Sequence, residues 1–413
     1  MVQKVSCHVP AAARIRLANA ENRWRRVLGL MLEAGLGDPV FGIALSGAIT
    51  IARHHTLKWL RVSRVVHQLG PVASAREPRY YADRMQEHSA VVEKLHGKRV
   101  LVVGDVMLDE YLRGDVARVS PDSPVPVLEV KSQELRLGGA GNTAANVVAL
   151  GGTAMLVGLI GRDEAARHVT AQTTKLRIAA MLSGDATRPT TKKTRLLAQG
   201  QAIVRLDQEK RHSADAGACT AMRDSIDKAF AAIGVDVVVI SDYNKGTITA
   251  EIAQYVIAAA RGKGVPIVVD SKRRDLAIFR GATLLMLELG ALDRAVPAGL
   301  SDYTVAEVAA AAVALAIVTD GAALVVRRGS DGWSLFASGA TPVHGNATTK
   351  EVFEGTGACD TQVATLALAL AAGSELSAAL HVAQRAAVVS TRGAVTVTAA
   401  ALLAALSAES AAP

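Results

Sequence analysis

The chain has 413 residues, of which half are hydrophobic and only 20% are charged. This composition excludes a largely disordered chain and supplies enough apolar side chains for a large core. Its three cysteines, Cys7, Cys219 and Cys359, are too few for a disulfide framework, which favours a reducing, cytoplasmic compartment. Aromatic residues make up 3%, so we expect no nucleic-acid partner bound through stacked bases.

The net charge of +8 is confined to the N-terminal fifth of the chain. Residues 1–85 contain 13 Lys and Arg against 5 Asp and Glu, whereas the two signs balance in 86–413. The apolar run at 40–52 is too short to cross a bilayer, so we expect no transmembrane segment. The basic stretch 53–67 is typical of a helix that binds a membrane surface or nucleic acid, or of a disordered or non-native appendage.

We favour the second interpretation of this stretch. The sequence therefore predicts a basic N-terminal extension over 1–85, disordered or non-native, and one folded domain over 86–413, with Met85 as a candidate start.

From Lys98 onward, apolar runs alternate with helix-like segments. This alternation predicts an α/β fold with a mostly parallel sheet and helices on both faces. The predicted strands are 99–108, 153–161, 235–243, 265–271, 282–288, 323–329 and 333–337. One predicted helix begins within 137–152. The other predicted helices cover about 217–233, 249–263, 303–317, 357–372, 376–390 and 397–408.

Two segments do not follow the buried-strand pattern. Residues 113–130 contain three prolines, and 193–209 has the pattern of a hairpin that turns near Gly200. Proline restricts a strand to a sheet edge. We therefore expect exposed lid strands near 111–130 and 193–209.

The strongest motif is Gly357-Ala358-Cys359-Asp360, at a strand-to-helix turn. The N–H groups of such a turn converge on an anion, and the helix dipole adds positive potential. A carboxylate beside them can take a proton from a hydroxyl during phosphoryl transfer. Asp360 is equally well explained as a helix cap, because Asp favours that position.

A second motif contains Gly138, Gly139 and Asn142. The glycines allow a ligand to approach the backbone, and the amide of Asn142 can hydrogen-bond a sugar hydroxyl. The alternative is a tight turn with a capping Asn. Asp105 and Asp109 follow a buried strand, where they are suited to binding polyol hydroxyls or to stabilising a turn.

Lys192, Lys193 and Arg195 form a basic group on a predicted strand. Such side chains bind phosphate through charge-assisted hydrogen bonds, or they form the solvated face of the strand.

Together these motifs resemble the ribokinase-like (PfkB-type) carbohydrate kinases, over about residues 86–408. Within that family, 99–130, 188–209, 237–249 and 278–285 look most like the kinases of D-glycero-β-D-manno-heptose 7-phosphate. The resemblance implies a three-layer α/β/α core with a small β-flap lid, ATP and Mg²⁺ as cofactors, and a homodimer formed through the flap. It implies phosphorylation of the anomeric hydroxyl to a 1,7-bisphosphate, a precursor of the lipopolysaccharide core.

The resemblance also implies roles for individual residues. Asp360 is the general base, and the anion hole is formed by Gly357, Ala358 and Cys359. The residues expected to bind substrate are Asp109, Gly138, Gly139, Asn142 and Lys193. Those expected to bind nucleotide are Glu288, Gly329 and Gly332, and no metal ligand is identified.

Four departures from the family pattern fall on the nucleotide side. Cys359 replaces a Gly of the family pattern, and Arg327 replaces a Thr. Glu354 replaces an Asp, and Gly355 follows it where a larger residue is usual. Glu288 replaces an Asn, and Ala291 replaces a Glu. Loss of one phosphate-stabilising donor costs about 10²–10³ in rate. The sequence therefore leaves open a working kinase and a degenerate paralogue that binds sugar phosphate with little or no kinase activity.

Overall fold

The computed structural model describes residues 87–232, 234–296, 299–345, 357–391 and 396–410. The chain separates into two units, Met1–Tyr80 and Tyr81–Pro413, and all described residues belong to the second. The predictions for 1–85, Glu354 and Gly355 therefore fall outside the described residues.

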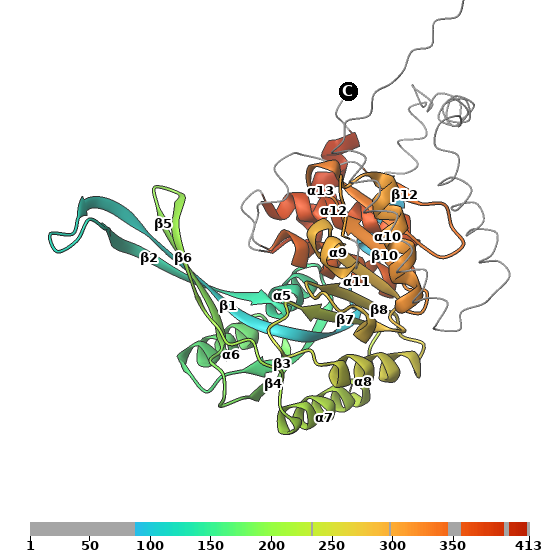
Figure 1. Cartoon of the computed structure of the whole chain (residues 1–413), viewed down its shortest axis with the longest axis horizontal. Helices are drawn as coiled ribbons and strands as arrows, with labels where there is room; N and C mark the ends of the chain where they lie inside the picture. Colours follow the sequence, from blue (N-terminus) through green and yellow to red (C-terminus); the bar gives the residue numbers. More distant parts are fainter. Residues whose placement is uncertain (1–86, 233, 297–298, 346–356, 392–395, 411–413) are drawn as a thin grey trace, which may run out of the picture. The chain divides into compact units, whose positions relative to one another are not determined.

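A twisted, mostly parallel sheet forms the centre of the described domain (Figure 1). Its main path has the order β12-β11-β10-β9-β8-β7-β1-β3-β4, in which β10 through β4 are parallel and β11 and β12 are antiparallel. The bounds are β1 Arg99–Val119, β3 Thr153–Ile160, β4 Ala179–Gly184, β7 Val237–Asp242, β8 Ile267–Ser271, β9 Leu284–Glu288, β10 Ala323–Arg327, β11 Trp333–Phe336 and β12 Val343–Gly345.

Helices cover both faces of this sheet because its central strands are apolar on both sides. In β1, Val100 and Val102 pack into one core cluster, whereas Leu101 and Val103 pack into the other. The first cluster includes side chains of α5 Ala140–Ala149, α6 Glu164–Lys175, α11 Ala358–Ala371, α12 Leu376–Thr391 and α13 Ala399–Ser410. The second includes side chains of α7 Ala216–Ala232, α8 Ala250–Arg261, α9 Leu289–Ala295 and α10 Val305–Val318.

The predicted three-layer α/β/α architecture is therefore confirmed. In Figure 1, α7 and α8 lie on one side of β7 and β8, and α11 lies on the other.

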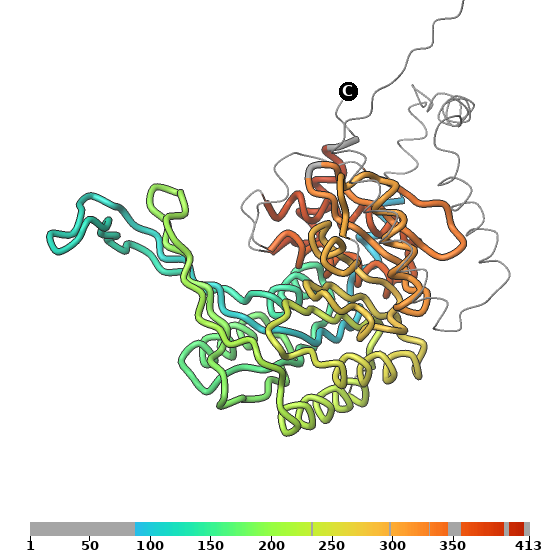
Figure 2. The backbone as a smooth tube through the Cα atoms, viewed as in Figure 1, coloured from blue at the N-terminus to red at the C-terminus, as the bar shows by residue number. Residues whose placement is uncertain are grey.

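The lid is formed where β1 continues beyond the core sheet. Beyond Val106, β1 pairs antiparallel with β2 Pro126–Gly139 and parallel with β5 Thr191–Ala198, which forms a hairpin with β6 Gln201–Gln208. Figure 2 shows these strands extending away from the helical layers. Because β1 belongs to both sheets, residues near its middle lie where the lid joins the core.

No helix of the described residues combines the length and the apolar character that a membrane span requires.

Candidate active site

The predicted site residues collect at the carboxyl edge of the parallel sheet. Glu288 and Arg327 end β9 and β10, and Asp270 is the next-to-last residue of β8. Helix α11 begins at this edge, with Gly357 as its N-cap and Asp360 in its first turn. Parallel α/β sheets bind ligands at this edge, because the loops that follow each strand meet there.

Asp360 is buried and receives hydrogen bonds from three side chains. Its carboxylate accepts them from Asn142 Nδ2 at 2.8 Å, Thr143 Oγ1 at 3.3 Å and Tyr243 OH at 2.6 Å. Gly357, and not Asp360, is the N-cap of α11, and among the described residues no side chain caps this helix end. The carboxylate therefore faces α5 and the loop after β7 instead of capping its own helix.

Burial raises the pKa of Asp360 to about 6, and the nearby Asp270 adds to this rise. The hydrogen bonds from Tyr243 and Asn142, together with the charge of Lys272, act in the opposite direction and lower the pKa. A carboxylate whose pKa lies close to neutrality is well matched to accept a proton from a hydroxyl.

Gly357 is required by both its conformation and its surroundings. Its φ is 98°, and a Cβ built on it would lie 2.8 Å from Asn142 Nδ2. A larger residue would be strained and would displace Asn142 from Asp360.

The motif predicted to bind substrate lies next to Asp360. Asp109 of β1 forms an ion pair with Arg195 of β5, with Oδ1 and Nη1 2.5 Å apart. A Cβ on Gly138 would clash with the Asp109 carboxylate, and one on Gly139 would lie 2.5 Å from the Asp105 carbonyl oxygen. The structure thus brings Asp109, Gly138, Gly139 and Asn142 together around one small region.

Asp105 has a structural role that the sequence did not distinguish from substrate binding. Its buried carboxylate accepts hydrogen bonds from the backbone N–H groups of Tyr243, Lys245 and Thr247. These bonds hold the loop after β7, and so place the Tyr243 hydroxyl on Asp360.

Lys193 lies on β5 at the position paired with Asp109. Its Nζ donates to Asp207 Oδ2 at 3.1 Å and lies 3.8 Å from Glu209 Oε2. Lys193 is therefore already paired with acidic residues of β6 and the segment after it.

The same lid sheet carries a group of arginines around Tyr111. The guanidinium carbons of Arg113, Arg136 and Arg195 lie 5.2, 4.8 and 5.2 Å from the centre of the Tyr111 ring. Glu134 neutralises part of this charge by pairing with Arg113 and Arg136. We call Tyr111, Arg113, Arg136 and Arg195 the lid arginine cluster.

On the side predicted to bind nucleotide, Glu288 contacts the start of α11. Its Oε1 lies 3.9 Å from Cys359 Sγ and 3.7 Å from Lys272 Nζ. Burial raises the pKa of Cys359 to about 11, so this side chain is a neutral thiol. Gly329, with a φ of 63°, begins the short 3-10 helix that follows β10, and Gly332, with a φ of 85°, is its C-cap.

A sequence profile of pfkB family carbohydrate kinases matches residues 98–400 of this chain. The chain belongs to the pfkB family.

The chain is also similar in sequence to the curated bifunctional proteins HldE. The bifunctional protein HldE of Caulobacter sp. (strain K31) is 44% identical over 280 residues, which are 67% of this chain and 56% of that protein. HldE of Pseudomonas aeruginosa (strain LESB58) is 41% identical over 288 residues, 70% of this chain and 59% of that protein. The chain thus spans less than two thirds of the length of these relatives.

Solved structures of other sugar kinases share the fold. Phosphofructokinase-2 from Escherichia coli, in complex with fructose-6-phosphate, superposes with a TM-score of 0.61 at 16% identity, covering 76% of this chain and 99% of the other. Arabidopsis thaliana ribokinase, complexed with ribose and ATP, gives a TM-score of 0.57 at 20% identity, covering 75% and 99% of the two chains. These similarities confirm the predicted ribokinase-like fold.

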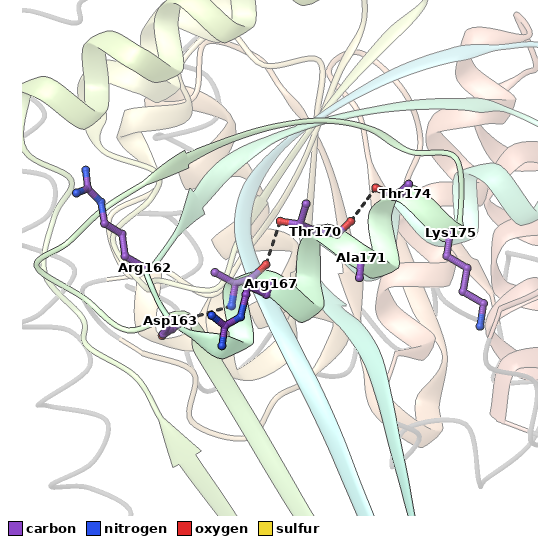
Figure 3. A pocket seen from close by; sticks show the side chains of 8 residues that line it. Arg162, Asp163, Arg167, Thr170, Ala171, Thr174 and Lys175 are labelled. Carbon is purple, nitrogen blue, oxygen red and sulfur yellow. Dashed lines mark hydrogen bonds between the residues drawn. The ribbon is translucent and has the colours of Figure 1, made fainter.

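A groove of the pfkB domain lies away from the residues described above. It has a volume of about 810 Å³ and runs along α6, with Arg162, Arg167 and Lys175 among its lining residues (Figure 3). None of the predicted site residues lines it. We therefore place the candidate active site at the carboxyl edge of the sheet, where the hydrogen-bonded carboxylate and the helix N-terminus lie.

Tyr243 and Arg136 are two of the contributors to this site that sequence reasoning missed. Tyr243 lies in the segment used for the family resemblance, but its hydroxyl was not assigned to Asp360. Arg136 was also missed, because only the pairing of β2 with β1 brings it opposite Asp109.

Proposed function

We propose that this chain is an ATP-dependent kinase that phosphorylates a sugar phosphate, with heptose 7-phosphate as substrate and its anomeric hydroxyl as acceptor. The observation that carries the proposal is Asp360. It is buried at the N-terminus of α11, its pKa is raised to about 6, and it lies next to the substrate-side motif. Membership of the pfkB family and the resemblance of 99–130 to heptose-phosphate kinases support it.

In the proposed reaction, Asp360 takes the proton of the sugar hydroxyl as its oxygen attacks the γ-phosphorus. A new P–O bond forms, the bond from the γ-phosphorus to the bridging oxygen breaks, and that electron pair leaves with ADP. The N–H groups of Gly357, Ala358 and Cys359 stabilise the charge on the transferred group. Tyr243 and Asn142 orient the carboxylate through the hydrogen bonds described above.

Asp109, Gly138, Gly139 and Asn142 would bind the sugar, and Lys193 would contribute positive charge nearby. The lid arginine cluster supports a substrate that already carries a phosphate, because Arg195 links this cluster directly to Asp109. Gly329 and Gly332 would contact the nucleotide, and Glu288 would lie beside its phosphates.

Mg²⁺ is proposed only as the ion that accompanies ATP and neutralises its phosphates. Among the described residues, no group of three or more His, Cys, Asp or Glu side chains could hold a metal ion. We therefore assign no step to a metal held by the protein.

A second candidate function is a sugar-phosphate-binding protein with little or no kinase activity. One observation favours it: the Glu288 carboxylate lies beside Cys359 in the proposed anion hole, where a phosphate would be repelled. The two functions share the sugar side of the site and differ on the nucleotide side.

We further propose that the protein acts in the cytoplasm, in the synthesis of the lipopolysaccharide core, and that two copies pair through their lids. The lid exposes apolar side chains, among them Val119, Ile203 and Leu206, which are 61%, 43% and 56% exposed. Exposed apolar groups on one surface are typical of a contact with another protein.

The test is a coupled assay of ADP release by the full chain with Mg-ATP and a panel of sugars. The panel contains heptose 7-phosphate, the unphosphorylated heptose and fructose 6-phosphate. We expect turnover with heptose 7-phosphate, and a fall of about 10²–10⁴-fold in kcat for Asp360→Asn. Binding of the sugar phosphate to that variant, measured by calorimetry, should stay within about twofold.

No turnover by the wild-type chain, with sugar phosphate still bound, would favour the non-catalytic function. Unchanged turnover in Asp360→Asn would remove Asp360 from the role of base.

A further inference from the structure

Arg327 is a buried cation that uses only part of its hydrogen-bonding capacity. Its side chain is 4% exposed, and its Nη2 donates to Asp270 Oδ1 at 2.5 Å. Its Nε and Nη1 are buried, and neither has a hydrogen-bond partner among the described residues. Leaving buried donors of a charged group unpaired is costly, so native proteins rarely do it without a function.

A second buried pair in the same domain shows the purely structural arrangement. The side chains of Arg188 and Asp185 are 6% and 4% exposed, almost as in Arg327 and Asp270. Arg188 donates from Nε to Asp185, from Nη1 to the Lys245 carbonyl and from Nη2 to the His212 carbonyl. All three of its nitrogens are paired, whereas only one nitrogen of Arg327 is.

The position of Arg327 explains what its unpaired donors could bind. It ends β10 and lies beside Glu288, its register partner on β9, at the edge where α11 begins. Lys272 supplies a second cation, with its Nζ 3.7 Å from Glu288 and 4.5 Å from the centre of the Tyr243 ring. Since Tyr243 donates to Asp360, Lys272 lies close to the proposed base, and the charge of Arg327 acts on the preceding residue, Cys359.

We propose that Arg327 and Lys272 bind a phosphate group of the nucleotide, and that Glu288 competes with this phosphate for the same two cations and the start of α11. The inference rests on the proposed function, because it assumes that ATP binds at this edge. It deepens that function by naming the residues that hold the phosphates and the one that opposes them.

The chemistry of the three side chains fits this assignment. A guanidinium donates through a planar fork that matches two phosphate oxygens, and such charge-assisted hydrogen bonds are about twice as strong as neutral ones. Glu288 and Lys272 are 46% and 40% exposed, so both can change rotamer toward solvent. Asp270 holds the guanidinium of Arg327 in place, while the two unpaired nitrogens of that guanidinium donate hydrogen bonds to the phosphate.

The test measures binding of ADP and of adenosine to the full chain by calorimetry, with EDTA present. Arg327→Met should weaken ADP binding by about 10–10²-fold, because it removes hydrogen bonds to a charged group. Adenosine binding should not change, since adenosine has no phosphate. Arg188→Met is the matched control, and it should change neither affinity by more than about twofold.

Variants of the two half-exposed residues, Glu288 and Lys272, allow a second measurement that does not depend on whether Arg327→Met folds. We expect Glu288→Gln to strengthen ADP binding by about 2–5-fold and Lys272→Met to weaken it by a similar factor. Shifts in the same direction, or no shift in either variant, would overturn the proposal. So would equal losses of ADP and adenosine binding in Arg327→Met, or a wild-type chain that does not bind ADP.

The outcome is separable from that of the kinase assay. If ADP binding responds to the variants as expected but no sugar phosphate is turned over, the proposed kinase activity fails and the phosphate site stands. If turnover is observed and ADP binding is insensitive to Arg327, the phosphate site fails and the kinase activity stands.

Discussion

The two sides of the candidate site, the proposed sugar side and the proposed nucleotide side, differ in how completely their polar groups are paired. On the sugar side, Asp109 is paired with Arg195, Lys193 with Asp207, and Asn142 with Asp360. On the nucleotide side, two buried nitrogens of Arg327 have no partner among the described residues, and Glu288 lies near the neutral thiol of Cys359.

This difference in pairing indicates how each side of the site would bind a ligand. Paired side chains in a low-dielectric setting hold one another in place, so the sugar side is preorganised. On the nucleotide side, unpaired donors and half-exposed charged side chains can rearrange around an incoming phosphate. Asp360 lies at the junction, because its partners come from α5 and the loop after β7 and its neighbouring residue, Cys359, contacts Glu288.

The largest expected effect concerns Asp360 itself, as a pH-dependent change in stability. Its folded-state pKa of about 6 lies above the usual 3.8, so its contribution is fully present below about pH 4 and is lost as the pH rises through 6. An amide does not ionise, so Asp360→Asn should be more stable than the wild type by roughly 3 kcal/mol at pH 8 and about equal to it at pH 4. Urea denaturation at a series of pH values measures this difference. A difference in stability that does not change with pH would show that Asp360 is ionised at little cost.

The next effect tests whether the sugar side is independent of the nucleotide side. Asp109→Asn should weaken sugar-phosphate binding by about 10–10²-fold, because a charged hydrogen-bond acceptor is lost. ADP affinity should not change. Glu110→Gln is the control: Glu110 is the next residue of β1, both residues are 8% exposed, and Glu110 bonds Thr194 and Gln133 instead. Equal losses in the two variants would mean that lid stability, and not sugar contact, is being measured.

A smaller effect addresses the tuning of Asp360. The hydrogen bond from Tyr243 lowers the pKa of Asp360, so Tyr243→Phe should raise that pKa. The acid limb of kcat/KM, expected near pH 6 in the wild type, should move upward by about one pH unit. Tyr255→Phe removes a comparable hydrogen bond to Asp227 on the surface, and should leave the profile unchanged. A profile that is identical in all three proteins would remove Tyr243 from the tuning of the base.

The smallest effect concerns the lid, which belongs to the sugar side. If two copies pair through their lids, Leu206→Lys should weaken the dimer by about 5–10-fold, because a half-exposed apolar side chain no longer becomes buried. Val313→Lys on α10 is the control, since Val313 is 64% exposed but lies outside the lid. Analytical ultracentrifugation at several protein concentrations measures the dimer dissociation constant of each variant. Equal dissociation constants would place the dimer contact elsewhere.

The core strands were predictable because they are apolar on both faces, a local property of runs such as 99–108. Strand β4 and helix α6 were not predicted. β4 lies at the edge of the sheet and none of its residues is fully buried, and its short apolar run begins with two alanines, which are depleted in strands.

Within the site, local sequence was sufficient for groups that lie close together in the chain. The Gly357–Asp360 turn is such a case, because a glycine before a helix with a carboxylate in its first turn is visible in the sequence. The glycines at 138 and 139 are another.

Tertiary structure alone decided the pairings between distant residues. Arg327 meets Asp270, 57 positions away, because β8, β9 and β10 are neighbours in one parallel sheet. Tyr243 meets Asp360, 117 positions away, because Asp105 holds the loop after β7. Spacing along the chain carries no signal for such contacts, since the order of the strands in the sheet determines which of their ends lie together.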